Sequence, residues 1–191
     1  MKRQYRILIV LLATGLAAAV GGTVSYGAFS ASTTNPANEF ASGTVALEDN
    51  DTGTSMLSLT TAVPGATDTS CIHVTYTGSL DSAVRLSASV TGTLAPHLTL
   101  TVTRGTDATP TFDSCSAFTA DTTDHMSLGP GVVYSGPLSG YPAAAASGIV
   151  DPDTWSTGDA HDYRFAVTLD DNDAAQGQSA SATFRWEARN L

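Results

Sequence analysis

The sequence predicts an all-β protein: an antiparallel β-sandwich of jelly-roll type with about nine strands, preceded by a cleavable signal peptide. Three observations support this prediction. Helical periodicity is nearly absent after Ala28, whereas apolar and polar residues alternate with a period of two in several stretches. Turn-forming clusters of glycine, proline, asparagine and aspartate separate these stretches. Many short strands without helices bury one face each by packing as two sheets.

The strands differ in how clearly the alternation marks them. The clearest have apolar residues at every second position, and they are 83–92, 97–104, 162–170 and 179–190. Weaker strands are predicted at 43–48, 55–60, 70–77, 113–118 and 131–138. The stretch 139–153 is rich in alanine, serine and proline, and we expect a long surface loop there. The sequence contains no internal repeat that would indicate a second domain.

The N-terminus has the pattern of a secretory signal peptide, with a basic start, a short apolar segment at 7–20, and then small residues. Ser25 and Gly27 are small residues at the −3 and −1 positions of a cleavage site between Gly27 and Ala28. The alternative is an uncleaved membrane anchor, but the short apolar segment favours cleavage. We therefore expect a secreted protein that contacts the membrane only through its signal peptide before cleavage.

The predicted chain organisation has three parts: a signal peptide at 1–27, an N-terminal arm at 28–36 and one sandwich domain at 37–191. Lys2, Arg3 and Arg6 leave with the signal peptide, so five arginines remain against 18 acidic residues, a net charge of −13. Phosphate binding needs clustered cations. This balance therefore argues against nucleic acids and anionic membranes as partners of the mature chain.

Cys71 and Cys115 are the only two cysteines in the sequence. An exported chain meets an oxidising compartment, so we expect one intramolecular disulfide between them. In the expected strand, Cys71 alternates with Ile72, Val74 and Tyr76, so its thiol leaves their face and needs a neighbour elsewhere. Two cysteines this far apart in the sequence form no zinc motif.

No motif indicates a catalytic residue, a bound cofactor or a metal ion. None of His73, His97, His125 and His161 belongs to a metal-binding pattern. His161 and Asp162, close to Asp159, could orient a metal or a base, but a solvated loop is the simpler interpretation. The acidic clusters at 48–51 and 170–173 lack the EF-hand pattern, which favours turns, with weak calcium binding as the alternative. Serine and cysteine nucleophile motifs are also missing.

Three stretches, taken together, resemble the TasA/camelysin family of exported proteins. The first is AFSASTTNPANEFASGTVAL at 28–47, with an Ala-Phe start and a Phe-x-x-Gly-Thr-x-x-Leu element. The second is the Pro64-Gly65 turn followed by a strand and Gly-Ser-Leu at 78–80. The third is QGQSASATFRWEA at 176–188, similar to a Gln-Gly-x-Ser turn before a last strand. They occur in the family's order, and the region between about 91 and 152 has no match.

The resemblance implies a jelly-roll-like domain, export through a dedicated signal peptidase, and assembly into extracellular fibres of a biofilm matrix. The expected partner is another copy of the chain, and the resemblance leaves accessory matrix proteins open as further partners. Camelysin-type members are classed as metallopeptidases, which is one alternative. The other is a monomeric adhesive or carbohydrate-binding module, for which Tyr141 and Trp155 in the predicted loops are the candidate contact residues.

The arm is a candidate donor strand for a neighbouring subunit. Phe29, Ala31 and Thr33 alternate with Ala28 and the serines that follow, so an extended arm has one partly apolar face. A proline at position 36 then stops the strand. Strand addition gains main-chain hydrogen bonds, and a side chain in a pocket sets the register. The alternative is an exposed tail without a partner.

Overall fold

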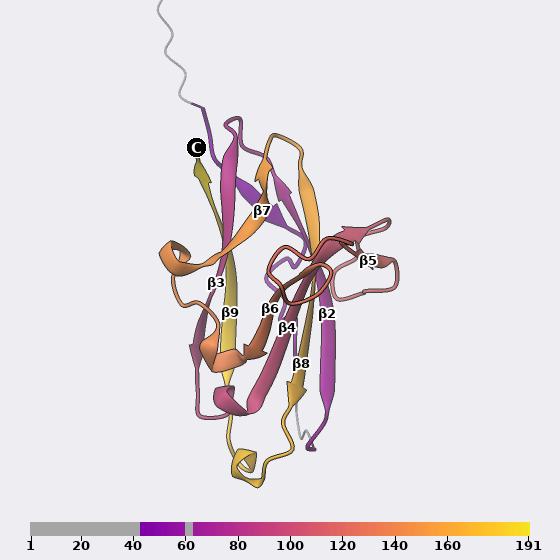
Figure 1. Cartoon of the computed structure of the whole chain (residues 1–191), viewed down its shortest axis with the longest axis vertical. Helices are drawn as coiled ribbons and strands as arrows, with labels where there is room; N and C mark the ends of the chain where they lie inside the picture. The colour runs from indigo at the N-terminus through magenta and orange to yellow at the C-terminus, as the bar shows by residue number, and fades with distance from the viewer. Residues whose placement is uncertain (1–42, 60–62) are drawn as a thin grey trace, which may run out of the picture. The chain divides into compact units, whose positions relative to one another are not determined.

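Two antiparallel sheets face each other in the computed structural model, which describes residues 43–59 and 63–191 (Figure 1). The large sheet has six strands in the order β1-β2-β8-β4-β5, and β6 also pairs with β4. Its strands are β1 (Leu47–Asp49), β2 (Thr67–Tyr76), β4 (Leu98–Asp107), β5 (Phe118–Ala120), β6 (Val132–Pro137) and β8 (Ala160–Leu169). The small sheet has the order β7-β3-β9, formed by β7 (Ile149–Trp155), β3 (Ser82–Thr91) and β9 (Ser181–Asn190). The predicted all-β sandwich of about nine strands is confirmed.

The chain crosses repeatedly between the two layers. Strand β2 lies in the large sheet, β3 in the small sheet and β4 in the large sheet again. The C-terminal part alternates in the opposite order, with β7 in the small sheet, β8 in the large sheet and β9 in the small sheet. The only helices in the described ranges are single 3₁₀ turns: η1 (Ala95–His97), η2 (Leu138–Gly140), η3 (Ala145–Ser147) and η4 (Asp173–Ala175). No helix among these residues has the length and apolar character to cross a membrane.

The core follows the period-two pattern of the sequence. Val84 and Leu86 of β3 face Leu100 of β4 and Phe165 of β8, and each of these side chains is at most 2% exposed. Because successive side chains of a strand point to opposite faces, this alternation places one apolar row of each strand between the sheets. Strand β9 is different, since its inward row is only half buried. The small sheet is therefore less completely covered along β9 than along β3.

Three parts of the strand prediction are wrong. Residues 55–59 of the predicted strand 55–60 form no strand in the structure. The predicted strand 113–118 is replaced by a turn, and β5 begins only at Phe118. The predicted loop 139–153 contains the start of β7, which pairs with β3. Alternation within a short stretch does not decide whether a second strand lies beside it, and that partner makes the strand.

The turn at 113–117 has a local cause. Asp113 has a positive φ of 68°, a backbone conformation that interrupts an extended strand. Its N–H donates to the backbone carbonyl of Cys71, which holds the turn against β2. The disulfide partner of Cys71 lies in the same turn. A tethered turn replaces the expected strand.

Candidate functional site

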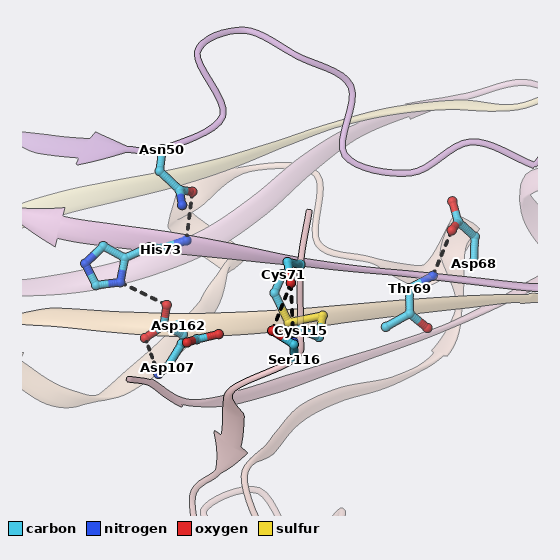
Figure 2. The surroundings of a disulfide bond; sticks show 10 residues. Asn50, Asp68, Thr69, Cys71, His73, Asp107, Cys115, Ser116 and Asp162 are labelled. Atoms are coloured by element: carbon cyan, nitrogen blue, oxygen red, sulfur yellow. Dashed lines mark hydrogen bonds and ion pairs between the residues drawn. A yellow bond between two sulfur atoms is a disulfide. The ribbon is translucent and has the colours of Figure 1, made fainter. Parts of the chain in front are cut away.

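The expected disulfide is present. Cys71 and Cys115 are bonded, with their Cα atoms 5.2 Å apart, and Cys71 is buried (Figure 2). Cys71 points away from the core face that carries Ile72 and Val74, as the strand alternation predicts. The bond attaches the 108–117 loop to the outer face of the large sheet. It is a structural cross-link between segments 44 residues apart in the sequence.

His73 and Asp162 form a pair on the same outer face. Nδ1 of His73 lies 2.9 Å from Oδ1 of Asp162, and Oδ2 of Asp162 accepts a hydrogen bond from the Asp107 N–H at 2.8 Å (Figure 2). The backbone N–H of His73 donates to Oδ1 of Asn50 at 3.0 Å. Both carboxylate oxygens of Asp162 are therefore engaged in holding β2, β4 and β8 together. This arrangement anchors the three strands to one another.

His161 and Asp162 do not act together, contrary to the hypothesis that they orient one metal or base. They are consecutive residues of β8, so their side chains leave the strand on opposite faces. Asp162 contacts His73, whereas His161 contacts Arg104. Asp159 accepts a hydrogen bond from the Ser156 N–H in a turn. The interpretation of 161–162 as a solvated loop is also wrong, because both residues lie within a paired strand.

The most buried group of charges surrounds Arg104 of β4, between the two sheets. Its guanidinium bonds Asp121 through Nη1 and Asp153 through Nη2, and its Nε lies 3.0 Å from Oδ2 of Asp151. Nη2 also lies 2.8 Å from Nε2 of His161. We call these five residues the Arg104 cluster. Burial alone would lower the pKa of Arg104, but the three carboxylates outweigh it and raise that pKa.

Asp151 is the buried acceptor at the centre of the Arg104 cluster. Its carboxylate accepts hydrogen bonds from Trp155 Nε1 at 3.0 Å, from Tyr163 Oη at 2.5 Å and from the Asp153 N–H at 3.1 Å. The Arg104 guanidinium, with Nε 3.0 Å from Oδ2 of Asp151, supplies the opposite charge that a buried carboxylate requires. Burial is also the main cause that raises the pKa of Tyr163, with the Asp151 charge adding to it. The cluster therefore joins β4 and β8 of the large sheet to β7 of the small sheet.

Donor atoms of Asp151, Asp153 and His161 lie within 4.8 Å of one another, close enough to hold a metal ion. The guanidinium of Arg104 already contacts all three side chains. A metal ion would have to displace a buried cation that is held by three carboxylates. The geometry thus fits a structural ion-pair network better than a metal site. Sequence reasoning missed it because Asp151 and Asp153 were assigned to a surface loop.

A groove opens along β9, where no strand of residues 43–59 or 63–191 closes the space between the two sheets. Its cavity volume is about 630 Å³, and Ala182, Phe184 and Trp186 of β9 form one wall. Its floor reaches the core residues Ile72 and Leu100. A smaller hollow of about 280 Å³ continues it toward β1 and shares Phe184 and Trp186. We call the two hollows together the β9 groove.

Two strand edges border the β9 groove. Strand β9 is the last strand of the small sheet, so among the described residues its outer edge has no ladder partner (Figure 1). Strand β2 pairs with β1 over only three residue pairs, from Leu47↔Tyr76 to Asp49↔Val74. Unpaired edges present N–H and C=O groups that can pair with another chain. The groove therefore combines an apolar floor with the outer edge of β9, whose main-chain groups have no ladder partner in the part of the chain that the structure describes.

The other residues singled out from the sequence fall into two groups. Tyr141 and Trp155 were expected in exposed loops, but they are 4% and 0% exposed. Tyr141 packs edge-on against Phe184, and Trp155 belongs to the surroundings of Asp151. The cleavage site at Gly27 and Ala28 and the donor-strand residues Phe29, Ala31 and Thr33 lie outside the described residues.

Comparisons of the sequence with protein-family models and with curated proteins find no match. The likeness to the TasA/camelysin family therefore rests on the three sequence stretches given above and remains a prediction.

Proposed function

We propose that this protein is a secreted structural subunit of extracellular or surface fibres. In this proposal, the N-terminal arm of one copy adds as a strand in the β9 groove of the next copy. The observation that carries the proposal is the groove itself: an apolar opening into the core beside the outer edge of ten-residue β9, which has no ladder partner among the described residues. Globular proteins normally cover or shorten such edges, because they invite pairing with another chain.

The dimensions of the arm and the groove are compatible. The part of the arm that would add as a strand, residues 28–34, spans roughly 23 Å when extended, and ten-residue β9 spans roughly 33 Å. The arm carries no charged side chain and has one large apolar residue, Phe29. Burying Phe29 would contribute roughly 1.5–3 kcal/mol, in addition to the main-chain hydrogen bonds along β9. Before cleavage, the signal peptide would keep the arm from entering a groove, which would couple export to assembly.

The alternatives have less support. An adhesive or carbohydrate-binding module needs exposed aromatic side chains, and the two loop candidates, Tyr141 and Trp155, are buried. A metallopeptidase needs about three protein ligands with an open metal position. The one group of such donors among the described residues is already engaged by Arg104.

Electron microscopy and sedimentation of the purified chain beginning at Ala28 test the proposal. We expect fibres from the mature chain and folded monomers after deletion of residues 28–34. Phe29→Asp should also abolish fibres, while Ser30→Asp is the matched control, with the same charge on the opposite face of the arm. Normal fibres from the deletion variant would refute the proposal.

A mixing experiment separates the two halves of the proposed contact. A chain without residues 28–34 retains a groove but has no arm to donate. When this chain is added to the full mature chain, its groove should accept the arm at a growing fibre end. Because it has no arm to offer the next copy, growth should stop there and the fibres should be shorter. If it has no effect on fibre length, β9 is not the acceptor.

A further inference from the structure

We propose that residues 55–59 are a displaceable cover on the β9 groove, held in place by apolar packing and removed when a strand is added to β9. The proposed occupant is the arm, residues 28–34, of a second copy, so this inference rests on the function proposed above. The cover itself is inferred from the described residues alone. It adds a conformational step that controls access to the groove.

The chain leaves the ladder just before the cover. Pairing between β1 and β2 ends at Asp49↔Val74, and at the next step the Asn50 side chain, not a backbone carbonyl, accepts the His73 N–H. Thr52 and Gly53 then have positive φ values of 51° and 79°. The turn is held by bonds to Asp51, whose Oδ1 accepts the Gly53 N–H at 2.6 Å and whose carbonyl accepts the Thr54 N–H at 2.9 Å. These positive φ values carry the chain away from the extended ladder.

The cover makes little use of its main chain. Within the described part of the protein, residues 55–59 form no backbone–backbone hydrogen bond. The Ser58 N–H donates to Oδ2 of Asp68 at 2.6 Å, and the Leu57 carbonyl accepts from Oγ of Ser55 at 3.3 Å. These are side-chain contacts at exposed positions. The cover therefore lies beside the groove without the cooperative ladder that stabilises a strand.

Apolar side chains are what hold the cover. Met56, Leu57 and Leu59 pack against the core, and all three line the groove, yet each is only partly buried. On the opposite wall, the indole Nε1 of Trp186 is buried without a hydrogen-bond partner among the described residues. The cover is thus held only by half-buried apolar contacts, and the indole donor has no acceptor. A fully paired strand in the same place would be bound more strongly than the cover. An added strand would supply both the ladder to β9 and carbonyl acceptors in the groove.

The cover reduces the apparent affinity of the groove, because only molecules with the cover displaced can pair along β9. Removing one of its apolar side chains should therefore raise the affinity for the arm. A partly buried methionine or leucine replaced by serine should tighten binding up to about tenfold, the factor that corresponds to 1.4 kcal/mol.

The test uses the chain from residue 35 onward and a synthetic peptide of residues 28–34 as the probe. Peptide affinity is measured for this chain, for Met56→Ser and for Leu57→Ser. Val150→Ser is the matched control, since Val150 is an exposed aliphatic residue on β7, at the other edge of the small sheet. Both cover variants should bind more tightly, and the control should not change. Weaker binding by both cover variants, with folding verified by urea unfolding, would mean that 55–59 is part of the binding surface and would overturn the proposal.

Amide hydrogen exchange provides a second, independent measurement. On binding the peptide, β9 should gain protection and residues 55–59 should lose it. Protection of β9 with unchanged exchange at 55–59 would overturn the cover while leaving the proposed function intact. If no variant binds the peptide and the full mature chain forms no fibres, both proposals are wrong.

Discussion

Arg104 brings together residues that are far apart in the sequence and lie on both layers of the sandwich. The side chain is inside the core, where an arginine is tolerated only if its charge is compensated. Asp151 supplies that charge from the small sheet, and its own remaining lone pairs are satisfied by Trp155 and Tyr163. Removing either partner of such a pair leaves a buried charge alone. Removing one partner should therefore lower the free energy of unfolding by more than the loss of one surface ion pair would.

Replacing Arg104 by methionine should lower the free energy of unfolding by about 3–5 kcal/mol, because Asp151 would keep a buried, uncompensated charge. Urea unfolding at pH 7.5 measures the effect. Adding Asp151→Asn to this variant should recover part of the loss. Arg189→Gln is the control: Arg189 pairs with Glu187 on the surface, and its loss should cost less than about 1 kcal/mol. Equal losses for Arg104→Met and the control would contradict the structural role of the cluster.

His161 makes the stability of the fold sensitive to pH. Burial and the positive charge of Arg104 lower the pKa of His161 from its ordinary value of 6.5, against the opposing effect of Asp151, Asp153 and Asp121. The unfolded chain therefore binds a proton near pH 6.5 that the folded chain does not. The stabilising contribution of neutral His161 is complete above pH 6.5 and declines as the pH falls below it.

We expect the free energy of unfolding to decrease between pH 7.5 and pH 5.5, by at most about 1.4 kcal/mol per pH unit for this one proton. Replacing His161 by glutamine retains an acceptor for Arg104 but does not titrate, so the decrease should become smaller. His125→Gln, at an exposed position, should retain the full pH dependence. Urea unfolding between pH 5.5 and pH 7.5 measures this dependence. If the free energy of unfolding of His161→Gln changes with pH as much as that of the wild-type chain, another group is responsible.

Among the elements, the 108–117 loop depends on its cross-link more than on its own hydrogen bonds. Apart from the disulfide, its contact with β2 includes the Asp113 N–H bond to the Cys71 carbonyl. Without the disulfide, the unfolded chain is less constrained and the loop loses its attachment. The effect should thus appear both in global stability and in local exchange.

The Cys71→Ser/Cys115→Ser double variant should lose about 4 kcal/mol of stability in the chain-entropy model for this separation. Urea unfolding with and without reductant measures it: the wild-type chain should fall to the level of the variant on reduction, and the variant should not change. Amide exchange in the 108–117 loop should increase. Identical stability with and without reductant in the wild-type chain would exclude a stabilising role for the cross-link.

At the scale of the whole molecule, the net charge opposes the proposed assembly. The chain from Ala28 onward, the proposed mature protein, carries a net charge of −13, and its five basic residues are all arginines. Copies of such a chain repel each other over distances of about 10 Å in 0.1 M salt, and less as salt is added. Repulsion of this kind keeps a protein with an exposed strand edge in solution until another interaction outweighs it.

Raising sodium chloride from 10 to 300 mM should accelerate fibre growth of the mature chain by roughly tenfold, because screening removes part of this repulsion. Light scattering with electron microscopy at fixed times measures the rate. Choline chloride at equal ionic strength should act in the same way. Acceleration by calcium at concentrations too low for screening would instead point to ion binding at the acidic clusters 48–51 and 170–173.

Much of the fold could be predicted from the sequence, because the information is local. Strands β3, β4 and β8 each carry an apolar row at every second residue, and that row enters the core. The disulfide could also be predicted, since the sequence contains only two cysteines and these allow one intramolecular pairing. Strand β7 was missed because Asp151 and Asp153, with a proline between them, are typical of a loop. Its place in the small sheet comes from pairing with β3.

By itself, the sequence determined the class of this protein: an all-β chain with one cross-link, whose alternating residues require two facing sheets. The tertiary structure alone decided what lies beside each strand. It placed His161 and Asp162 in different environments, enclosed Arg104 among three carboxylates from two segments, and left 55–59 without backbone pairing among the described residues, next to the open edge of β9. The physical reason is that alternation is a property of one segment, whereas pairing, charge compensation and grooves depend on residues distant in the sequence.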